Sequence, residues 1–117
     1  MVCRSVVYRY HMSYSKINNL TGWACFALAL LTYALTLEPK ASFWDCGEFI
    51  AAAFRLQIVH QPGAPLFLMI EKFFSLFAGQ DTQRIAYWMN LGSALASAGT
   101  ILFLCWTITA LAKKILV

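Results

Sequence analysis

Two long stretches without a charged residue dominate this chain, one from Leu20 to Leu37 and the other from Ile85 to Ala112. Each is long enough for a helix that crosses a bilayer, which needs about 18 or more apolar residues. Only 12% of the 117 residues are charged, against roughly a quarter in ordinary soluble domains. The pattern predicts an all-α membrane protein with two transmembrane helices, at about 17–37 and 85–112, whose apolar surface contacts membrane lipid.

The distribution of charge predicts the topology. The first stretch is preceded by basic residues without any acid, the second is followed by two lysines, and all five acids lie between them (Arg4, Arg9 and Lys16; Lys113 and Lys114; Glu38, Asp45, Glu48, Glu71 and Asp81). Basic residues near span ends stay in the cytoplasm. We therefore expect a loose cytoplasmic tail at 1–16, a cytoplasmic C-terminus and an external loop at 38–84. No basic face of a soluble helix is present, so a nucleic-acid partner is not expected.

Two short helices are expected in the external loop. The first, at about 45–58, is amphipathic, because Asp45, Glu48 and Arg55 share one face of a helical wheel. The second begins at Pro65 and reaches about residue 78, followed by Gly79 as a C-terminal cap. It is too short to cross a membrane, so we expect it to be half-embedded or packed against other helices. Glu71 and Lys72 in its middle are interpreted as a solvated edge.

Polar residues suited to chemistry gather around the first of these helices. Asp45 and Glu48 could act as acid and base on a hydroxyl group, although Asp-x-x-Glu at a helix start is also the pattern of a capping box. Trp44 could stack on a sugar ring or anchor the loop at the interface. Arg55 could bind a phosphate, or it could pair with Glu48 or extend toward the membrane surface. His60 could also bind a phosphate, or it could be satisfied by backbone. Cys and His spacings predict no metal site.

Several segments together are similar to the start of a known family. They are Asn18–Trp23, Leu35–Pro39, Ser42–Ala51, Pro62–Leu66, Phe73–Ala78, Ser93–Ser97 and Ile101–Leu104. The family was catalogued as domain of unknown function 2723 and includes the transmembrane-protein-260-like protein O-mannosyltransferases of the GT-C glycosyltransferase superfamily. The resemblance extends over about Lys16–Lys114, and it departs at Gln61 and at the charged pair Glu71–Lys72.

The resemblance implies that the chain is the N-terminal part of a polytopic enzyme in a bacterial inner membrane. Such an enzyme moves a sugar, here mannose, from a polyprenyl-phosphate donor to Ser or Thr of exported proteins. Asp45 would be the general base in the periplasmic first loop, and Glu48 would position the acceptor or tune Asp45. Independently of the resemblance, we expect Arg55 and His60 to bind the donor phosphate and Trp44 to stack on a sugar ring. No cofactor is expected, and the chain alone, without the remaining helices of the enzyme, is expected to be inactive.

The alternative is a small non-enzymatic membrane protein. In this interpretation the two spans form a hairpin that packs on a partner subunit. Its contact face would be the run of small residues from Gly92 to Gly99, because small residues let helices approach closely in a membrane.

Overall fold

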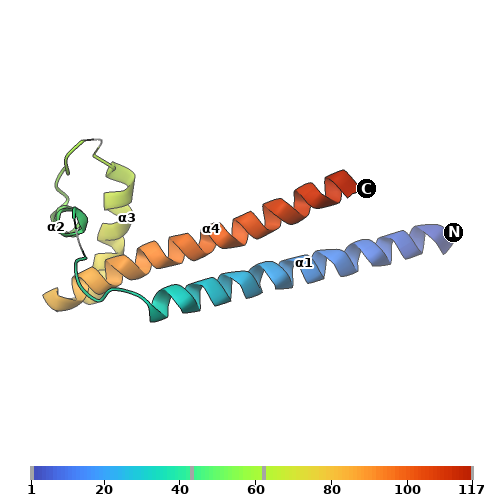
Figure 1. Ribbon diagram of the computed structural model, residues 1–117, viewed down its shortest axis with the longest axis horizontal. Coiled ribbons are helices and arrows are strands. Elements are labelled where there is room, and N and C mark those ends of the chain that lie inside the picture. Colours follow the sequence, from blue (N-terminus) through green and yellow to red (C-terminus); the bar gives the residue numbers. More distant parts are fainter. Residues whose placement is uncertain (1, 43, 62, 117) are drawn as a thin grey trace. The chain divides into compact units, whose positions relative to one another are not determined.

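The computed structural model describes residues 2–42, 44–61 and 63–116, and all the regular elements within these ranges are helical (Figure 1). The α-helices are α1 (Val2–Leu35), α2 (Cys46–Arg55), α3 (Pro65–Ser75) and α4 (Ile85–Leu116). Two short 3-10 helices, η1 (Leu76–Ala78) and η2 (Thr82–Arg84), lie between α3 and α4. The chain divides into two compact units. One contains α1 up to Leu31 with α4 from Ser97, and the other contains residues 32–96.

The first unit is a pair of antiparallel helices. The order of the contacts shows this, because the residue that comes earlier in α1 contacts the residue that comes later in α4. The Tyr14 hydroxyl donates to the Thr109 carbonyl at 3.2 Å, and the rings of Trp23 and Trp106 are edge to face with centroids 6.2 Å apart. Gly22 permits this approach, because a Cβ atom there would overlap the Trp106 indole. Close helix approach through a small residue is the packing that the apolar sequence favours.

The N-terminal tail differs from the expectation. Residues 1–16 were expected to be loose, but α1 begins at Val2 and continues through Lys16 without a break. No proline or glycine lies between Val2 and Lys16, so nothing in the local sequence stops the helix there. Whether this segment is cytoplasmic stays a prediction.

One helix, rather than the two predicted, meets the criteria for a membrane span in the described part of the chain. It is the segment Thr82–Ile115, formed by η2 and most of α4. The first predicted span, at 17–37, is not confirmed. Its uncharged helical part runs from Ile17 to Leu35, where α1 ends, and it begins with the polar residues Asn18 and Asn19, which lower its mean hydropathy.

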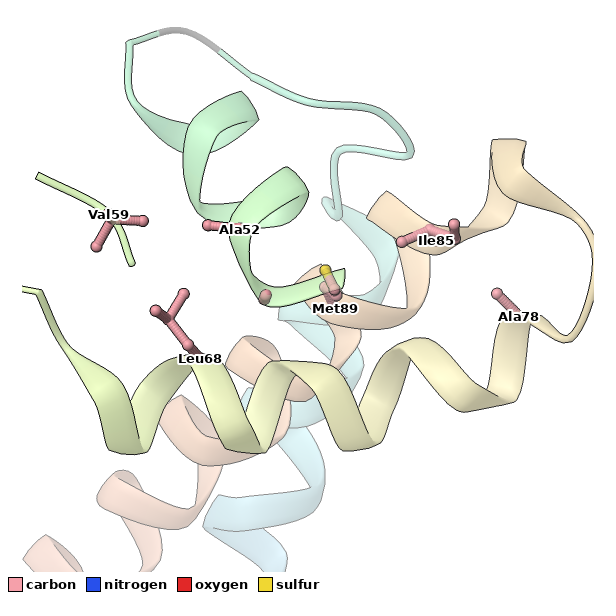
Figure 2. Packing of buried hydrophobic residues seen from close by; sticks show 7 residues of the cluster. Ala52, Val59, Leu68, Ala78, Ile85 and Met89 are labelled. Atoms are coloured by element: carbon pink, nitrogen blue, oxygen red, sulfur yellow. The ribbon is translucent and has the colours of Figure 1, made fainter. Parts of the chain in front are cut away.

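The second unit has a small hydrophobic core between α2, α3 and the start of α4. Ala52 of α2, Leu68 of α3 and Met89 of α4 belong to this core, which Figure 2 shows from close by. The other core residues are Ala53, Val59, Ala78 and Ile85. Because apolar residues of three helices are buried together, this core sets the position of α2 against α3.

The helix ends in this unit follow local signals. Pro65 is in the first turn of α3, as expected, and Gly79 lies directly after η1 with a φ of 58°. α2 is shorter than the predicted 45–58, because Leu56 adopts a left-handed conformation with a φ of 55°. This turn lets the N–H of Gln57 donate to the Ala52 carbonyl at 2.8 Å, which closes the helix.

Candidate functional site

The second unit contains a cavity of about 520 Å³. This volume lies in the range of about 300–1,000 Å³ that is usual for ligand sites. Its wall is mainly apolar, with a few polar side chains from α2, α3, α4 and the segments before α2 and α3. The lining residues are Trp44, Asp45, Cys46, Phe49, Ile50, Ala64, Phe67, Glu71, Met89, Asn90 and Ser93. An apolar cavity with few polar groups is the usual form of a binding site for a small molecule.

Two residues of the cavity wall have unusual backbone conformations. Trp44 has a φ of 63° and Ala64 a φ of 40°, both in the left-handed region. This region costs a residue with a side chain about 1–2 kcal/mol. The Trp44 side chain is 95% exposed, so its own packing does not compensate for that cost. Strained backbone gathers at functional sites more than elsewhere, which makes this wall a candidate site.

Asp45 lies at the cavity and does not cap a helix with its side chain. It occupies the N-cap position of α2, but its carboxylate accepts no capping hydrogen bond. Its backbone carbonyl accepts from the N–H of Phe49 at 3.0 Å. The capping-box interpretation is therefore wrong for the Asp45 and Glu48 side chains. The physical reason is that the Glu48 carboxylate has a different partner.

The partner of Glu48 is His60. The backbone N–H of His60 donates to Glu48 Oε1 at 3.0 Å, and the ring Nδ1 lies 3.0 Å from Oε2. The other ring nitrogen, Nε2, lies 3.8 Å from Asp45 Oδ2. The structure thus brings three predicted site residues together, with the imidazole between two carboxylates. The expected alternative that backbone satisfies His60 is replaced by a bond between side chains.

These contacts shift the pKa values of Glu48 and His60. The pKa of Glu48 is lowered, first by the hydrogen bond from the His60 backbone and then by the bond to the His60 ring. The pKa of His60 is raised, mainly by the hydrogen bond to Glu48, with a smaller contribution from the charge of Asp45. Both shifts favour the charged forms. The pair is a charge-assisted contact at an exposed site.

The remaining predicted site residues are Trp44 and Arg55, and they differ in whether they line the cavity. Trp44 lines the cavity beside Asp45. Glu48, His60 and Arg55 are not among its lining residues, and within the described ranges Arg55 forms no ion pair with Glu48. The described residues contain no group of three or more His, Cys, Asp or Glu side chains that could hold a metal ion. The substrate-binding roles of Trp44, Arg55 and His60 stay predictions.

Glu71 is a site residue that the sequence interpretation missed. It is not a solvated edge: it is only 4% exposed, in the wall of the cavity. Its Oε1 accepts a hydrogen bond from the Ser93 hydroxyl of α4 at 3.0 Å. Burial raises the pKa of its carboxyl, although the bond from Ser93 acts in the opposite direction. A signal was present in the sequence, because Glu71 lies three residues after Leu68 on a helix and so shares its buried face.

Asn90 and Lys72 fix the surroundings of the cavity. The Asn90 amide donates to the carbonyls of Glu38 at 2.8 Å and of Lys40 at 3.2 Å, which ties the segment after α1 to α4. The Lys72 ammonium donates to the Phe54 carbonyl and lies 4.5 Å from the centre of the Phe54 ring. The side chain of Lys72 therefore ties α3 to α2. Neither contact was predicted, because both join segments far apart in the sequence.

Comparison with known proteins identifies relatives of this segment. A family model described as the protein O-mannosyl-transferase TMEM260 N-terminal domain matches residues 45–117. A curated relative from Dictyostelium discoideum, the protein O-mannosyl-transferase tmem260, is 28% identical over 97 residues. This match covers 80% of the present chain but only 12% of the relative. No solved structure matches the chain.

Proposed function

The chain belongs to the family of the protein O-mannosyl-transferase TMEM260 N-terminal domain, and on this premise we propose that it supplies the catalytic first loop of a membrane glycosyltransferase. The enzyme transfers mannose from a polyprenyl-phosphate donor to Ser or Thr hydroxyls of exported proteins. It is of the GT-C type, and further helices of the complete enzyme enclose the lipid-linked donor. Asp45 is the general base. Loop 38–84 lies on the non-cytoplasmic side, where exported acceptors are found.

The observation that carries this proposal is the position of Asp45. Asp45 lines the cavity, and its carboxylate is not used to cap α2. Its side chain is 61% exposed, so an acceptor can reach it. A general base must come within hydrogen-bonding distance of the proton that it removes, and a carboxylate free of capping meets this need.

The reaction at this site is a displacement at the anomeric carbon. The Asp45 carboxylate accepts the proton of the acceptor hydroxyl, and the hydroxyl oxygen forms a bond to C1 of the sugar. The bond from C1 to the phosphate oxygen breaks, and polyprenyl phosphate leaves with the electron pair. No oxidant or reductant is required. The base contributes by raising the nucleophilicity of the hydroxyl, an effect that is typically about 10²–10⁴-fold.

Glu48 and His60 act through their contact with each other. Glu48 fixes the segment before α3 by accepting two hydrogen bonds from His60. Protonated His60 then places a positive charge beside the proposed base, because its Nε2 lies 3.8 Å from Asp45 Oδ2. In this proposal Arg55 contacts the phosphate of the donor, and Trp44 contacts its sugar. Their arrangement around the donor depends on the helices that complete the enzyme.

The test is Asp45→Asn in a complete enzyme that carries this N-terminal segment. Asparagine keeps the size of the side chain but cannot accept a proton. We expect the transfer rate to fall by about 10²–10⁴-fold, while the thermal unfolding midpoint in detergent stays close to that of the unmodified enzyme.

Asp81→Asn is the matched control. Asp81 lies away from the cavity, where its carboxylate accepts from the Gln83 N–H at 3.0 Å, and asparagine is also a good cap. This variant should transfer mannose at the normal rate. Full transfer by the Asp45→Asn enzyme would show that Asp45 is not the base.

A further inference from the structure

Only one of the two oxygens of the Glu71 carboxyl has a hydrogen-bond partner in the residues that the structure describes. Ser93 donates to Oε1 at 3.0 Å, whereas Oε2 has no hydrogen-bond partner in the described part of the chain. The residue is only 4% exposed, so water does not readily replace the missing partner. A buried polar atom without a partner is rare in native proteins and calls for a physical reason.

Stability does not supply that reason. A leucine of similar volume would fill this place without a desolvation cost and would pack beside Leu68 and Met89, which are buried in the same unit. Replacement of a buried, poorly satisfied polar group by an apolar one is often neutral or stabilising when the remaining partner finds another acceptor, and a helical serine such as Ser93 can donate to a backbone carbonyl one turn back. A residue that works against stability at the wall of a cavity is typical of a binding function.

We propose that Glu71, held by Ser93, is a sugar-binding residue that hydrogen-bonds a hydroxyl of the transferred hexose. The proposal rests on the proposed function and adds the group that recognises the sugar. Glu71 lines the same cavity as the base Asp45. The last torsion angle of a glutamate side chain varies over a broad range at little energetic cost. A small rotation can therefore turn Oε2 toward the cavity while Oε1 stays near Ser93.

The chemistry of the cavity fits a neutral sugar. Burial raises the pKa of Glu71, which shifts the carboxyl toward its neutral form, and that form offers an O–H donor to a hydroxyl oxygen. Phe49 and Phe67 contribute aromatic surface to the same wall, with ring centroids 5.9 Å apart in an edge-to-face arrangement. The C–H face of a pyranose can pack on such rings, while its hydroxyls bind Glu71 and Ser93.

Two substitutions separate binding from stability. Glu71→Leu removes the hydrogen bonds but keeps an apolar filling of similar size. Glu71→Gln keeps a neutral donor and an acceptor for Ser93. Both are made in a complete enzyme that carries this segment, and Asp45→Asn is prepared in parallel. Transfer is measured with polyprenyl-phosphate mannose and a Ser/Thr peptide, and thermal unfolding is measured with and without methyl α-mannoside.

We expect Glu71→Leu to unfold at the same temperature as the unmodified enzyme or higher. The KM for the donor should rise by about five- to tenfold with kcat nearly unchanged, as for the loss of one hydrogen bond made equally in ground and transition states. Glu71→Gln should keep KM within about twofold of the unmodified value, since its amide restores the donor. Methyl α-mannoside should raise the unfolding temperature of the unmodified enzyme and of Asp45→Asn, but not of Glu71→Leu.

Two results would overturn the inference. One is an unchanged donor KM in Glu71→Leu. The other is a loss in Glu71→Gln as large as in Glu71→Leu, which would show that an ionised carboxylate is needed. Failure of the proposed function has a different signature, in which Asp45→Asn transfers mannose normally. Protection by methyl α-mannoside that depends on Glu71 would still support sugar binding in that case.

Discussion

His60 binds Glu48 twice, through its backbone N–H to Oε1 and its ring Nδ1 to Oε2, each at 3.0 Å. The two residues are twelve positions apart, so the contact joins the first turn of α2 to the segment that leads into α3. It also leaves Nε2 facing Asp45 at 3.8 Å. The geometry of the proposed base therefore depends on a contact whose strength varies with pH.

The first prediction concerns this pH dependence. The raised pKa of His60 means that its contribution to stability is complete below the ordinary value of 6.5 and is lost as the pH rises through the folded-state pKa. The lowered pKa of Glu48 means that its contribution is complete above 4.5 and is lost as the pH falls through the folded-state pKa. The contact should therefore stabilise the fold most between about pH 4.5 and 6.5.

The measurement is an NMR titration of the His60 ring in the full chain, in detergent. Glu48→Gln should bring the His60 pKa back toward 6.5, because the amide removes the negative charge that favours imidazolium. Asp81→Asn, which changes a distant carboxylate, serves as the control and should leave the titration unchanged. A His60 pKa that is the same in Glu48→Gln and in the unmodified chain would contradict the contact.

The second prediction concerns the core of the second unit. Met89 of α4 is 2% exposed and belongs to the core that α4 shares with α2 and α3, so Met89→Ala leaves a cavity and should cost roughly 2–5 kcal/mol. Met69 is 66% exposed on α3 and gives the same change without a cavity. We expect Met69→Ala to cost less than about 1 kcal/mol. Unfolding of both variants by heat in detergent checks the difference, and equal losses would disprove the packing of Met89 in the core.

The third prediction concerns the close approach of α3 and α4. A Cβ atom at Gly92 would lie 2.5 Å from Cδ2 and 2.7 Å from Cγ of Phe74. Because Cγ is near the root of the side chain, the ring cannot avoid the clash cheaply, and Gly92→Ala should destabilise the unit by about 1–3 kcal/mol.

Gly99→Ala is the matched control on the same helix. A Cβ atom there meets nothing within 4 Å, so alanine should be neutral or stabilising by up to about 1 kcal/mol through its helix propensity. Thermal unfolding of the two variants should therefore shift in opposite directions or by clearly different amounts. A stable Gly92→Ala protein would show that α3 does not pack on α4 at this glycine.

The fourth prediction concerns topology. If loop 38–84 is external, a membrane-impermeant thiol reagent added to intact cells should label Cys46, which is exposed, and should leave Cys3 unlabelled. Variants that retain one of these cysteines each give the comparison, and permeabilised cells give the upper limit of labelling for both. Labelling of Cys3 without Cys46 would place the acids on the cytoplasmic side, and the proposed transfer to exported proteins would then be wrong.

Local signals in the sequence determine the positions of several helix ends. Proline at position 65 can begin a helix and cannot continue one, and Gly79 has the conformational freedom for a positive φ, so α3 and η1 lie where they were expected. The start of α4 at Ile85 also agrees with the expectation, because the uncharged stretch begins there. The gathering of Asp45 and Glu48 at the start of α2 is likewise a property of the sequence.

Other features depend on contacts between distant segments. Whether Glu48 caps its own helix or binds a histidine depends on where the chain returns after α2, and helix periodicity carries no information on that path. The burial of Glu71 depends on α4 covering it with Ser93, twenty-two residues away. The sequence determined where α2, α3 and α4 begin and which residues carry charge, because these are local properties of the backbone and side chains. Only the tertiary structure decided which of those charges meet and which are buried, because the nearness of distant residues is a property of packing.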